Sequence, residues 1–543
     1  MTPRLLNQHR RAILLVWAVG LCWCATASGQ TAATVAEAAD RARQWIARPT
    51  TTEHIKAFAP AADIWYRQYA TPRPLRVWIT RINLQMPGVR LAVTEPLPED
   101  QSGAGEEVRC ANTLEFAQQR GVQLAINTSA FDPFRPRMGM PMDVVGLAAF
   151  RGRQYSEPDE RFGALYVARD GRVALKGPPL PTADLWQVVP GFRLLLDDGQ
   201  VAVAQSVANS KFGNLNPRTA VGIDREGYTL WLIVVDGRQA GVSAGITLVE
   251  LACLFESLGV WDALNLDGGG SSTFVLQDAH GCSRVINTPV GRVTPHTLRQ
   301  VVCNLGVYLP GPGLPVEQSQ PKTLREAVVR LATQRRGGGF VLTGSGVSKT
   351  IHYDGQTLLH GNSKGTYCCG ATLETFLDAY CLVHHGVDAS AAPGRWFKNW
   401  PFEQIAALQQ GWYGTPKSES DPLIPAEFRK TILERQVCNV LQWAKLGTPV
   451  TDYRLLRRGD FVQFWRQSGS GHSVIFWGRD RDKDGRERLW YWSSQRKPRY
   501  KYPQTAGDEP VALPGWGLNW EYVDDEIDPA RIHGVSLKDA PAP

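Results

Sequence analysis

The chain has little charge and no strong excess of either sign. Only 20% of its 543 residues are charged, and 59 basic against 52 acidic residues give a formal net charge of +7. This near balance argues against nucleic acid as the main partner, because nucleic acid selects strongly basic surfaces. With 43% hydrophobic residues, 52 glycines and 36 prolines, the composition is that of a folded, loop-rich protein, and it excludes a disordered or fibrous chain.

Long apolar runs are missing beyond the N-terminus. Residues 12–21 are apolar, follow Arg4, Arg10 and Arg11, and precede the small residues 25–29. This pattern predicts a secretory signal peptide over residues 1–29. The alternative is a retained anchor, but the run is shorter than the ~20 apolar residues that a bilayer core requires. We therefore expect a secreted or periplasmic protein with no stable membrane span once the signal is cleaved.

Cysteine pairs with metal-binding spacing are also absent. No C-x-x-C pair and no His/Cys cluster occurs, which argues against a structural zinc site. An oxidising compartment permits disulfides, and Cys282 with Cys303 is the candidate pair because both lie in strand-like segments near the end of one domain. The cysteines outside the signal are Cys110, Cys253, Cys282, Cys303, Cys368, Cys369, Cys381 and Cys438.

No internal repeat is present, so a propeller or solenoid is not expected. The length predicts more than one domain, and a Pro/Gly-rich stretch predicts a linker over 310–323. We expect an α+β protein, with a mixed-sheet domain followed by a smaller α+β domain. The predicted ranges are a signal peptide over 1–29, an N-terminal helical lead-in over 30–75, a first domain over 76–309 and a second domain over 324–543.

The most informative stretch of the first domain ends in three consecutive glycines. Thr247 and Glu250 form a T-x-x-E capping box that predicts the start of a helix, and Gly259 predicts its end. An apolar strand and Gly268–Gly270 follow, and then Ser271–Thr273. Glycines leave backbone N–H groups open to a phosphate, and the three hydroxyls add donors. The alternative is a tight turn that needs positive φ.

Four separated motifs give this triplet its context. In chain order they are Asn127 in LAINTSAF, Pro217–Ala220, Val235–Arg238 and Asn265–Thr273. Together they resemble the phosphodiester glycosidase family. The resemblance covers about residues 76–309 and extends to a matching segment, 287–302, that contains Arg299.

The resemblance implies hydrolysis of a sugar joined through its anomeric carbon to a phosphodiester. Arg218 and Arg238 would contact the phosphate, because a guanidinium matches its oxygens. Asp236 and Asp267 would be the catalytic carboxylate pair, with the acid and base not distinguished. The other substrate-binding residues implied are Asn127, Thr219, Asn265, Gly268, Gly269, Gly270, Ser271, Ser272, Thr273 and Arg299.

Each of these roles has a structural alternative. Asp236 precedes Gly237 and is typical of a turn, and Arg218 is also compatible with a surface ion pair. We expect no cofactor and assign no metal ligand, although a divalent metal shared by Asp236 and Asp267 stays open.

The second domain centres on Cys368 and Cys369 at the start of a predicted amphipathic helix. The partial positive charge at the N-terminus of a helix favours a thiolate. Far along the chain, His472 begins a predicted strand, and a further strand ends in Ser493, Ser494 and Gln495.

This order resembles the NlpC/P60 group of papain-like cysteine peptidases. The resemblance implies Cys368 as nucleophile, with Cys369 as the alternative, and His472 as base. The third member is ambiguous between Ser493 and Gln495, of which Gln495 is preferred. Gly459–Asp460 matches the strand before the histidine. The separation of Cys368 from His472 is wide for the group, and Tyr367 stands where Asp is common. The alternatives are a buried or disulfide-bonded cysteine pair and an ordinary strand-end histidine.

The sequence therefore predicts an exported hydrolase. It would cleave a sugar from a phosphodiester-linked glycoconjugate and carry a cysteine amidase or peptidase domain. Its substrate would be a sugar phosphodiester or a cell-wall glycan. The alternatives are a glycan-binding protein without turnover, and a chain in which only the C-terminal domain is active. Residues 480–485 predict a charged hairpin turn in preference to a calcium loop. The tryptophans of the last 150 residues predict an aromatic core in preference to a saccharide groove.

Overall fold

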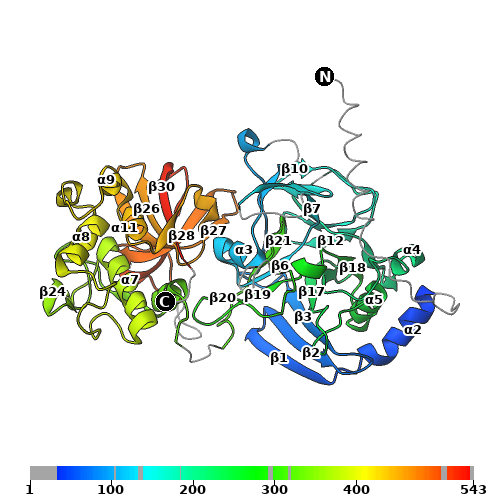
Figure 1. The fold of residues 1–543 in the computed structure, drawn as a ribbon. Helices are drawn as coiled ribbons and strands as arrows, with labels where there is room; N and C mark the ends of the chain where they lie inside the picture. The colour runs from blue at the N-terminus through cyan, green and yellow to red at the C-terminus, as the bar shows by residue number, and fades with distance from the viewer. Residues whose placement is uncertain are drawn as a thin grey trace.

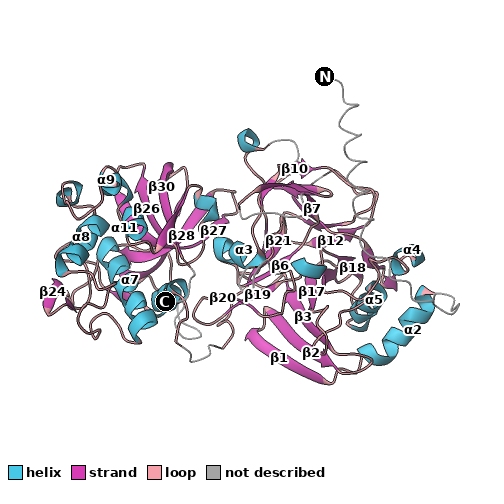
Figure 2. Ribbon diagram, in the orientation of Figure 1, coloured by secondary structure: helices cyan, strands magenta, loops and turns pink. Residues whose placement is uncertain are grey.

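The computed structural model describes residues 34–102, 106–132, 139–183, 185–291, 298–315, 320–502 and 510–538. The signal peptide expected over 1–29 lies outside these residues. Two halves lie side by side, and each is built around its own β-sheets (Figures 1 and 2). The α+β class is confirmed. The ladders are antiparallel throughout the first half, where a parallel pair occurs as the isolated bridge Asp278–Leu314.

The chain enters the first half through helix α2 (Val35–Ile46), which Thr34 and Glu37 cap reciprocally. Strands β1 (Thr51–Phe58) and β2 (Ala62–Tyr69) follow and pair onto β3 (Leu75–Asn83). Within the lead-in expected over 30–75, the helix is confined to α2, and β1 and β2 follow it. The β-branched and aromatic residues of these two segments favour strands, because their side chains pack well on a pleated sheet. The edge of β3 offers such a sheet, on which β2 and then β1 pair.

The largest sheet of the first half has eight strands in the order β1-β2-β3-β17-β16-β18-β14-β15. The predicted capping box is confirmed, because Thr247 and Glu250 open helix α5 (Leu248–Ser257), whose apolar side packs on this sheet. The remaining strands are β14 (Leu194–Asp197), β15 (Gln200–Val201), β16 (Arg218–Ile223), β17 (Thr229–Val235) and β18 (Asp262–Asn265), and the short helix α4 spans Gln205–Ala208.

A five-stranded sheet in the order β20-β19-β6-β21-β4 packs against the largest sheet through a shared apolar core. Its strands are β4 (Arg90–Val93), β6 (Leu124–Asn127), β19 (Phe274–Gln277), β20 (Ser283–Val285) and β21 (Asn304–Tyr308), with helix α3 (Thr113–Arg120) alongside. A second five-stranded sheet contains β9 (Ala148–Phe150), β10 (Arg153–Ser156), β11 (Ala164–Val167), β12 (Val173–Lys176) and β13 (Gln187–Pro190), and a three-stranded sheet contains β5 (Val108–Arg109), β7 (Phe131–Asp132) and β8 (Pro141–Val144).

The second half contains a seven-stranded sheet in the order β22-β29-β28-β27-β26-β30-β25, with helices packed against one face. Its strands are β22 (Gly337–Gly338), β25 (Gly447–Val450), β26 (Phe461–Arg466), β27 (Gly471–Arg481), β28 (Glu487–Gln495), β29 (Gly515–Tyr522) and β30 (Ile527–Leu537). The other elements are α6 (Leu324–Gln334), β23 (Ile351–Tyr353), β24 (Gln356–Leu359), α7 (Cys368–His385), α8 (Phe402–Tyr413), α9 (Ala426–Arg429), α10 (Ile432–Arg435) and α11 (Val437–Trp443).

The two halves are joined by a buried arginine. The guanidinium of Arg458, in the second half, donates hydrogen bonds to the carbonyl oxygens of Gly121 and Gly281 of the first half, each at 2.9 Å. It also donates to Trp477 O at 3.0 Å. The beginning of the predicted linker is hydrogen-bonded to the first half, because Leu314 N donates to Gln277 O. Residues 316–319 of that linker lie outside the described residues.

The cysteine prediction is wrong. None of the eight described cysteines forms a disulfide bond. Cys282 precedes β20 and Cys303 precedes β21, and the sheet order places β19 and β6 between these strands. Neighbouring strands lie ~4.8 Å apart, so three steps exceed the reach of a disulfide.

Two other predictions are confirmed. Residues 480–485 form a hairpin turn between β27 and β28, in which Gly485 N donates to Asp482 O. The tryptophans contribute to an aromatic core, in which Trp396, Trp412 and Trp492 are buried. Within the part of the chain that the structure describes, no helix is long and apolar enough to cross a membrane.

Candidate active sites

The glycine triplet of the first half lies among three arginines. It follows β18, and Gly269 has a φ of +60°. A Cβ atom built on Gly268, Gly269 or Gly270 would lie 3.7 Å from Arg218 Cδ, 3.2 Å from Arg238 Nη2 or 3.3 Å from Arg299 Nη1, respectively. The structure therefore brings the three predicted arginines to one loop, where side chains larger than glycine would crowd them.

Arg218 is a buried cation without an acidic partner among the described residues. Its Nη2 donates to the carbonyl oxygens of Phe212 at 2.6 Å and Asn214 at 2.8 Å. Burial, with some repulsion from Arg238, lowers the pKa of Arg218 to about 10. The surface ion pair considered from the sequence is wrong. Arg218 holds the 212–214 loop and adds a positive charge beneath the glycines.

The other two arginines are more accessible. Arg238 is exposed, has a φ of +57°, and donates from Nε and Nη2 to Asn216 Oδ1 at 3.0 and 2.7 Å. The Arg299 guanidinium lies 5.3 Å from the centre of the Phe131 ring. Burial lowers the pKa of Arg299, while the Asp267 carboxylate opposes that shift. The guanidinium groups of Arg238 and Arg299 thus lie near the glycine loop. Arg238 is held there by the Asn216 side chain, and Arg299 lies near the Phe131 ring and the Asp267 carboxylate.

Asp267 lies directly before the triplet and is partly buried. Its backbone N–H donates to Thr128 O at 2.6 Å. Burial raises the pKa of Asp267 to about 6, against the opposing effects of the Ser271 hydrogen bond and the Arg299 charge. A carboxylate with this pKa is a stronger base than an ordinary aspartate and is still ionised at neutral pH.

Asp236 follows β17 and is enclosed, with an exposed fraction of 1%. Its Oδ1 accepts hydrogen bonds from Thr288 N at 3.0 Å and from Asn287 Nδ2 at 3.1 Å. Burial raises the pKa of Asp236, and these hydrogen bonds oppose the shift. Sequence reasoning missed this role of Asn287 and Thr288, since its only sign is a polar pair 51 and 52 residues away.

Asn127 connects three of the predicted motifs. It ends β6 and is fully buried. Its Nδ2 donates to Asp267 O at 2.6 Å, and its Oδ1 accepts from Thr219 Oγ1 at 2.8 Å and from Thr273 N at 3.1 Å. The carboxamide is therefore occupied by protein groups and sets the position of the glycine loop.

Polar atoms near the loop that are buried without a hydrogen-bond partner in the described chain include Asn265 Oδ1 and Ser272 Oγ. A buried polar atom without a hydrogen bond is costly, typically by about 1–3 kcal/mol. Such atoms in a candidate site are therefore suited to contact a polar ligand.

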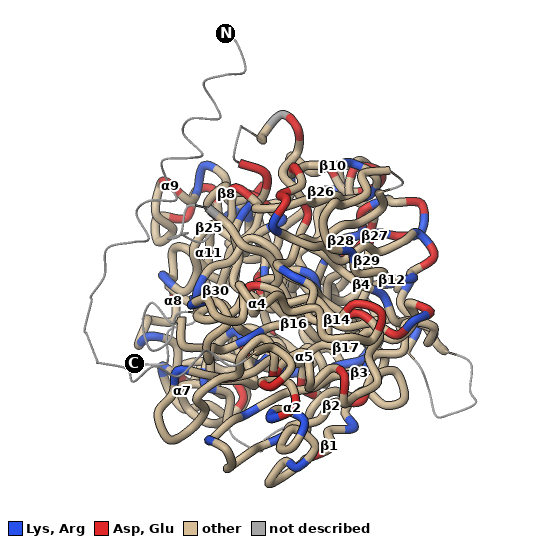
Figure 3. The backbone as a smooth tube through the Cα atoms, turned by 90° about the vertical axis from the view of Figure 1, so that its right-hand side faces the viewer, with Lys and Arg blue, Asp and Glu red and all other residues tan. Residues whose placement is uncertain are grey.

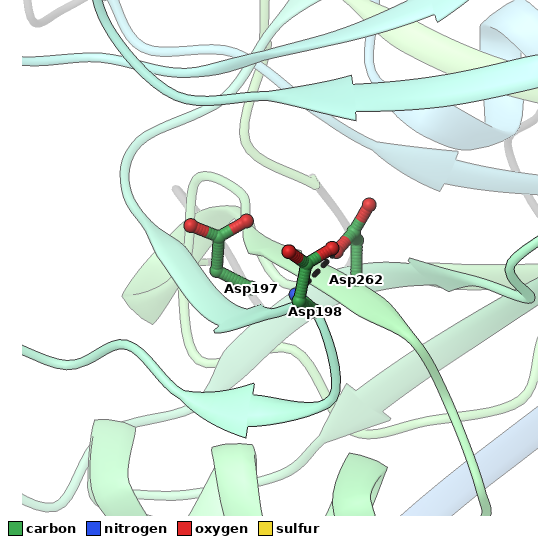
Figure 4. A group of neighbouring side chains, drawn as sticks. All are labelled: Asp197, Asp198 and Asp262. Carbon is green, nitrogen blue, oxygen red and sulfur yellow. Dashed lines mark hydrogen bonds between the residues drawn. The ribbon is translucent and has the colours of Figure 1, made fainter.

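Neither predicted carboxylate belongs to a cluster of metal-binding type in the described ranges. The group found there is Asp197, Asp198 and Asp262, whose ligand atoms lie within 4.8 Å of one another (Figure 4). Asp198 N donates to Asp262 Oδ1 at 3.0 Å. Asp262 begins β18, whereas the glycine loop follows its end, so this acidic group lies apart from the loop.

Cys368 and His472 of the second half are brought together. Cys368 is the first residue of α7, and the N-cap residue, Tyr367, provides no side-chain cap. A hydrogen bond with Cys369, at a sulfur separation of 3.8 Å, and the charge and hydrogen bond of His472 hold the pKa of Cys368 well below its ordinary value. These interactions outweigh burial, which acts in the opposite direction. The arrangement favours a Cys368 thiolate at the N-terminus of the helix.

Cys369 faces a different set of groups. Its Sγ lies 3.5 Å from Ser473 Oγ, and Ser473 Oγ donates to Gln463 Oε1 at 2.6 Å. The hydrogen bond to Cys368 and burial raise the pKa of Cys369 well above its ordinary value. The sequence analysis named neither Ser473 nor Gln463. Because side chains alternate along a strand, Ser473 lies on the face of β27 opposite to that of His472.

Gln495, the predicted third residue of this site, makes no hydrogen bond with His472. The His472 ring packs against Phe464 and Tyr491, and its Nε2 is buried with no partner in the described chain. Gln495 Oε1 is likewise buried without a hydrogen-bond partner among the described residues. Extending the Ile475–Trp492 register along β27 and β28 sets Gln495 opposite His472. Ser493 instead donates to Ser473 O at 2.9 Å.

Residues 120–308 match the phosphodiester glycosidase family. The range contains the arginine and glycine site and ends before α6. The chain is 30% identical over 269 residues to the N-acetylglucosamine-1-phosphodiester alpha-N-acetylglucosaminidase of Bos taurus, which covers 44% of this chain and 48% of that protein. It is 41% identical over 83 residues to an uncharacterized protein derived from the SPbeta prophage of Bacillus subtilis, covering 15% of this chain and 13% of that one. The chain thus spans at most about half the length of these curated relatives.

A solved structure is also similar to part of the chain. It is the catalytic domain of zebrafish N-acetylglucosamine-1-phosphodiester alpha-N-acetylglucosaminidase, auto-inhibited by its pro-peptide. The identity is 22%, the similar region covers 50% of this chain and 93% of that domain, and the TM-score is 0.36.

Proposed function

We propose that the first half hydrolyses a sugar phosphodiester and releases the sugar and a phosphomonoester. The observation that carries the proposal is the placement of Arg218, Arg238 and Arg299 against successive glycines beside Asp267. The family match over residues 120–308 supports a hydrolase of this class. The relatives' name makes an N-acetylglucosamine 1-phosphodiester the first compound to test.

The arrangement suits general-base chemistry better than general-acid chemistry. A water molecule attacks the anomeric carbon, the bond from that carbon to the phosphate oxygen breaks, and its electron pair stays on the phosphate. The arginines and the glycine N–H groups stabilise that anion, so the leaving group has little need of a proton. Asp267 takes the proton of the attacking water, and its raised pKa makes it a better base.

The remaining residues either contact the substrate or hold other residues of the site in position. Asn265 Oδ1 and Ser272 Oγ lack protein partners, so Asn265 Oδ1 accepts a hydrogen bond from the substrate and the Ser272 hydroxyl accepts or donates one. Asn127 acts through the glycine loop as a positioning residue. Asp236 positions the 287–291 segment, because its carboxylate is occupied by Asn287 and Thr288.

The test uses the purified full chain and a synthetic N-acetylglucosamine 1-phosphodiester, with free sugar measured by chromatography. Asp267→Asn should lower kcat at least ~10²-fold. Asp262→Asn is the matched control, because Asp262 begins the strand that precedes Asp267 and burial raises its pKa too, but it lies away from the loop. Equal turnover in both variants would exclude Asp267 from the reaction, and no turnover by the parent chain on a panel of sugar phosphodiesters would exclude the proposal.

We also propose that the second half is a cysteine amidase. The specific observation is the placement of Cys368 at the N-terminus of α7 beside His472, whose charge lowers the pKa of the Cys368 thiol. The Cys368 sulfur attacks an amide carbonyl, His472 gives a proton to the leaving amine, and water then hydrolyses the thioester. A side-chain rotation of Gln495 would bring its free Oε1 to His472 Nε2 and satisfy both buried atoms.

An exported protein would meet such amides in the peptide stems of the cell envelope. Incubation of the chain with purified stem peptides and mass spectrometry of the products tests this. Cys368→Ala should abolish cleavage, whereas Cys369→Ala, at the neighbouring position, should slow cleavage without abolishing it. Intact peptides with parent protein would leave the second half as a binding domain, which is the alternative function.

A further inference from the structure

A cavity of about 490 Å³ lies between the two halves, apart from both candidate sites. One wall is formed by β4, the turn between β11 and β12, and Trp186 of the first half. The other wall is formed by residues 480–483 of the hairpin between β27 and β28. Figure 3 shows β4, β12 and β27 close together on the right of that view. No residue of the cavity wall belongs to either site described above.

The cavity has an excess of basic side chains. Six basic residues line it, against three acidic ones, Asp170, Asp480 and Asp482. Each acidic group already pairs with an arginine outside the cavity wall: Asp170 with Arg172, Asp480 with Arg488, and Asp482 with Arg486. The six basic residues are Arg90, Arg120, Arg151, Arg169, Arg481 and Lys483.

Three of these cations have no carboxylate partner. Arg90, Arg120 and Arg481 form ion pairs, with Asp480, Glu95 and Glu487 as partners. Arg151, Arg169 and Lys483 form no ion pair with any carboxylate in the described ranges. Their positive charge is therefore directed at the space between the halves and at solvent.

The cations are arranged around an aromatic ring. Arg169 Cζ lies 4.2 Å and Arg151 Cζ 5.3 Å from the centre of the Trp186 ring. Arg151 also donates from Nη1 to Gly485 O at 2.9 Å, so the second half holds it in place. Burial and repulsion from Arg481 lower the pKa of Arg151, as expected where like charges converge. Clustered cations without carboxylate partners lower the free energy of unfolding, and a bound anion would offset that loss.

We propose that this cavity binds a small organic anion that carries a phosphate or a carboxylate, and an anionic sugar is the probe that fits its size. Guanidinium groups bind both anions by paired hydrogen bonds. A volume of about 490 Å³ lies in the range of small-molecule sites, about 300–1,000 Å³, and accommodates a sugar unit with its charged group. A bound ligand would contact both halves through Arg151 and Lys483 and reinforce their association. This inference does not depend on the proposed hydrolysis, because it uses none of the same residues.

The test is isothermal titration calorimetry of the full chain with glucose 6-phosphate, glucuronate and glucose at low ionic strength. We expect one or both anions to bind and glucose to bind much more weakly, and the two anions distinguish phosphate from carboxylate. Arg169→Glu should weaken binding at least about tenfold, because it replaces an attractive charge with a repulsive one. Arg169 is exposed and has no hydrogen-bond partner among the described residues, so this variant should fold.

Two control variants locate the bound anion. Arg225→Ala removes a similar pair, in which Arg225 lies 5.0 Å from the Trp261 ring outside the cavity, and binding should be unchanged. Arg238→Ala removes an arginine of the glycine loop, and binding in the cavity should again persist. Arg151→Gln provides a second variant within the cavity. Equal binding of glucose, no binding of either anion, or binding that survives Arg169→Glu and Arg151→Gln would overturn the proposal. Loss of binding in Arg238→Ala would assign the anion to the glycine loop and overturn it too.

Discussion

The side chain of Asn127 donates a 2.6 Å hydrogen bond to the carbonyl oxygen of Asp267, 140 residues further along the chain. The same carboxamide accepts hydrogen bonds from Thr219 and Thr273. One buried group thus sets the positions of the strand β16 and of both ends of the glycine loop. The reactive geometry of the first half depends on a residue with no free atom for substrate.

Asn127→Ala should therefore impair both stability and turnover. Three hydrogen bonds are lost and their partners remain buried, which should lower the free energy of unfolding by about 3 kcal/mol. Urea denaturation measures this change. Thr219→Val removes one of the three hydrogen bonds and should cost less. A variant with unchanged stability but reduced turnover would show that Asn127 contacts substrate instead.

The raised pKa of Asp267 predicts opposite effects on activity and stability. If Asp267 is the base, kcat/KM should fall tenfold per pH unit below about 6 and be level above it. In the unfolded chain an aspartate has a pKa of about 3.9. The folded state therefore holds the proton more tightly, and this group lowers the free energy of unfolding as the pH rises from about 4 to about 6.

Asp267→Asn removes that penalty. At pH 7.5 the variant should be more stable than the parent, by up to about 3 kcal/mol, and at pH 3.5 the two should be alike. Chemical denaturation at the two pH values makes the comparison. A variant that is less stable at pH 7.5 would show that the ionised carboxylate is stabilised in the fold.

Arg218 and Arg238 should respond differently to replacement by lysine. Arg218 bonds three carbonyl oxygens, of Phe212, Asn214 and Ile246, and an ammonium group cannot reach all of them. Arg218→Lys should lower the melting temperature as well as kcat. Arg238 is exposed, so Arg238→Lys should raise KM with little change in melting temperature. Calorimetry and steady-state kinetics separate the two, and identical behaviour would contradict these roles.

Cys368 should be the most reactive thiol of the folded chain. Its lowered pKa predicts alkylation by iodoacetamide at about pH 6.5, where a free thiol, with a pKa near 8.5, is mostly protonated. Peptide mass spectrometry locates the label. His472→Ala and Cys369→Ala should each slow the reaction, since both native groups stabilise the thiolate. Cys438, whose pKa burial raises to about 12, is the internal control and should stay unlabelled. Labelling of Cys369 in place of Cys368 would reverse the assignment.

Arg458→Met should weaken the joint between the halves. The buried carbonyl oxygens of Gly121, Gly281 and Trp477 would lose their donor, at a cost of about 3 kcal/mol. Methionine keeps much of the apolar stem, which limits the effect to the hydrogen bonds. Arg454→Met, at a partly exposed position, should change stability much less, by about 0.5 kcal/mol. The midpoint of urea unfolding compares them, and similar midpoints would show that the halves associate without Arg458.

The elements that could be predicted are those with local signals. The capping box at Thr247 and Glu250, the turn at residues 480–485 and the start of α7 at Cys368 depend on residues a few positions apart. Hydrogen bonds between such neighbours form in any fold that admits the element. The candidate residues of the first half could also be collected from motifs, because each motif lies at the beginning or the end of a strand.

Their roles could not be predicted, because roles depend on distant neighbours. Asp236 and Asp267 are alike in sequence, yet one is closed off by Asn287 and Thr288 while the other borders the arginines. The strands that follow α2 could not be predicted for a related reason. Residues 51–69 become strands because the edge of β3 is available to them, and that edge lies beyond any local pattern.

The amino-acid sequence alone indicates which residue types contribute to the two sites: arginines, glycines and carboxylates in one half, and a cysteine at a helix start and a histidine on a strand in the other. Which arginine faces which glycine, the role of Asn127 in the loop and the separation of Cys282 from Cys303 follow from the tertiary fold. Local hydrogen bonds and side-chain periodicity act over one or two turns of chain. The order of strands in a sheet, which sets distances between remote residues, follows from packing the whole core.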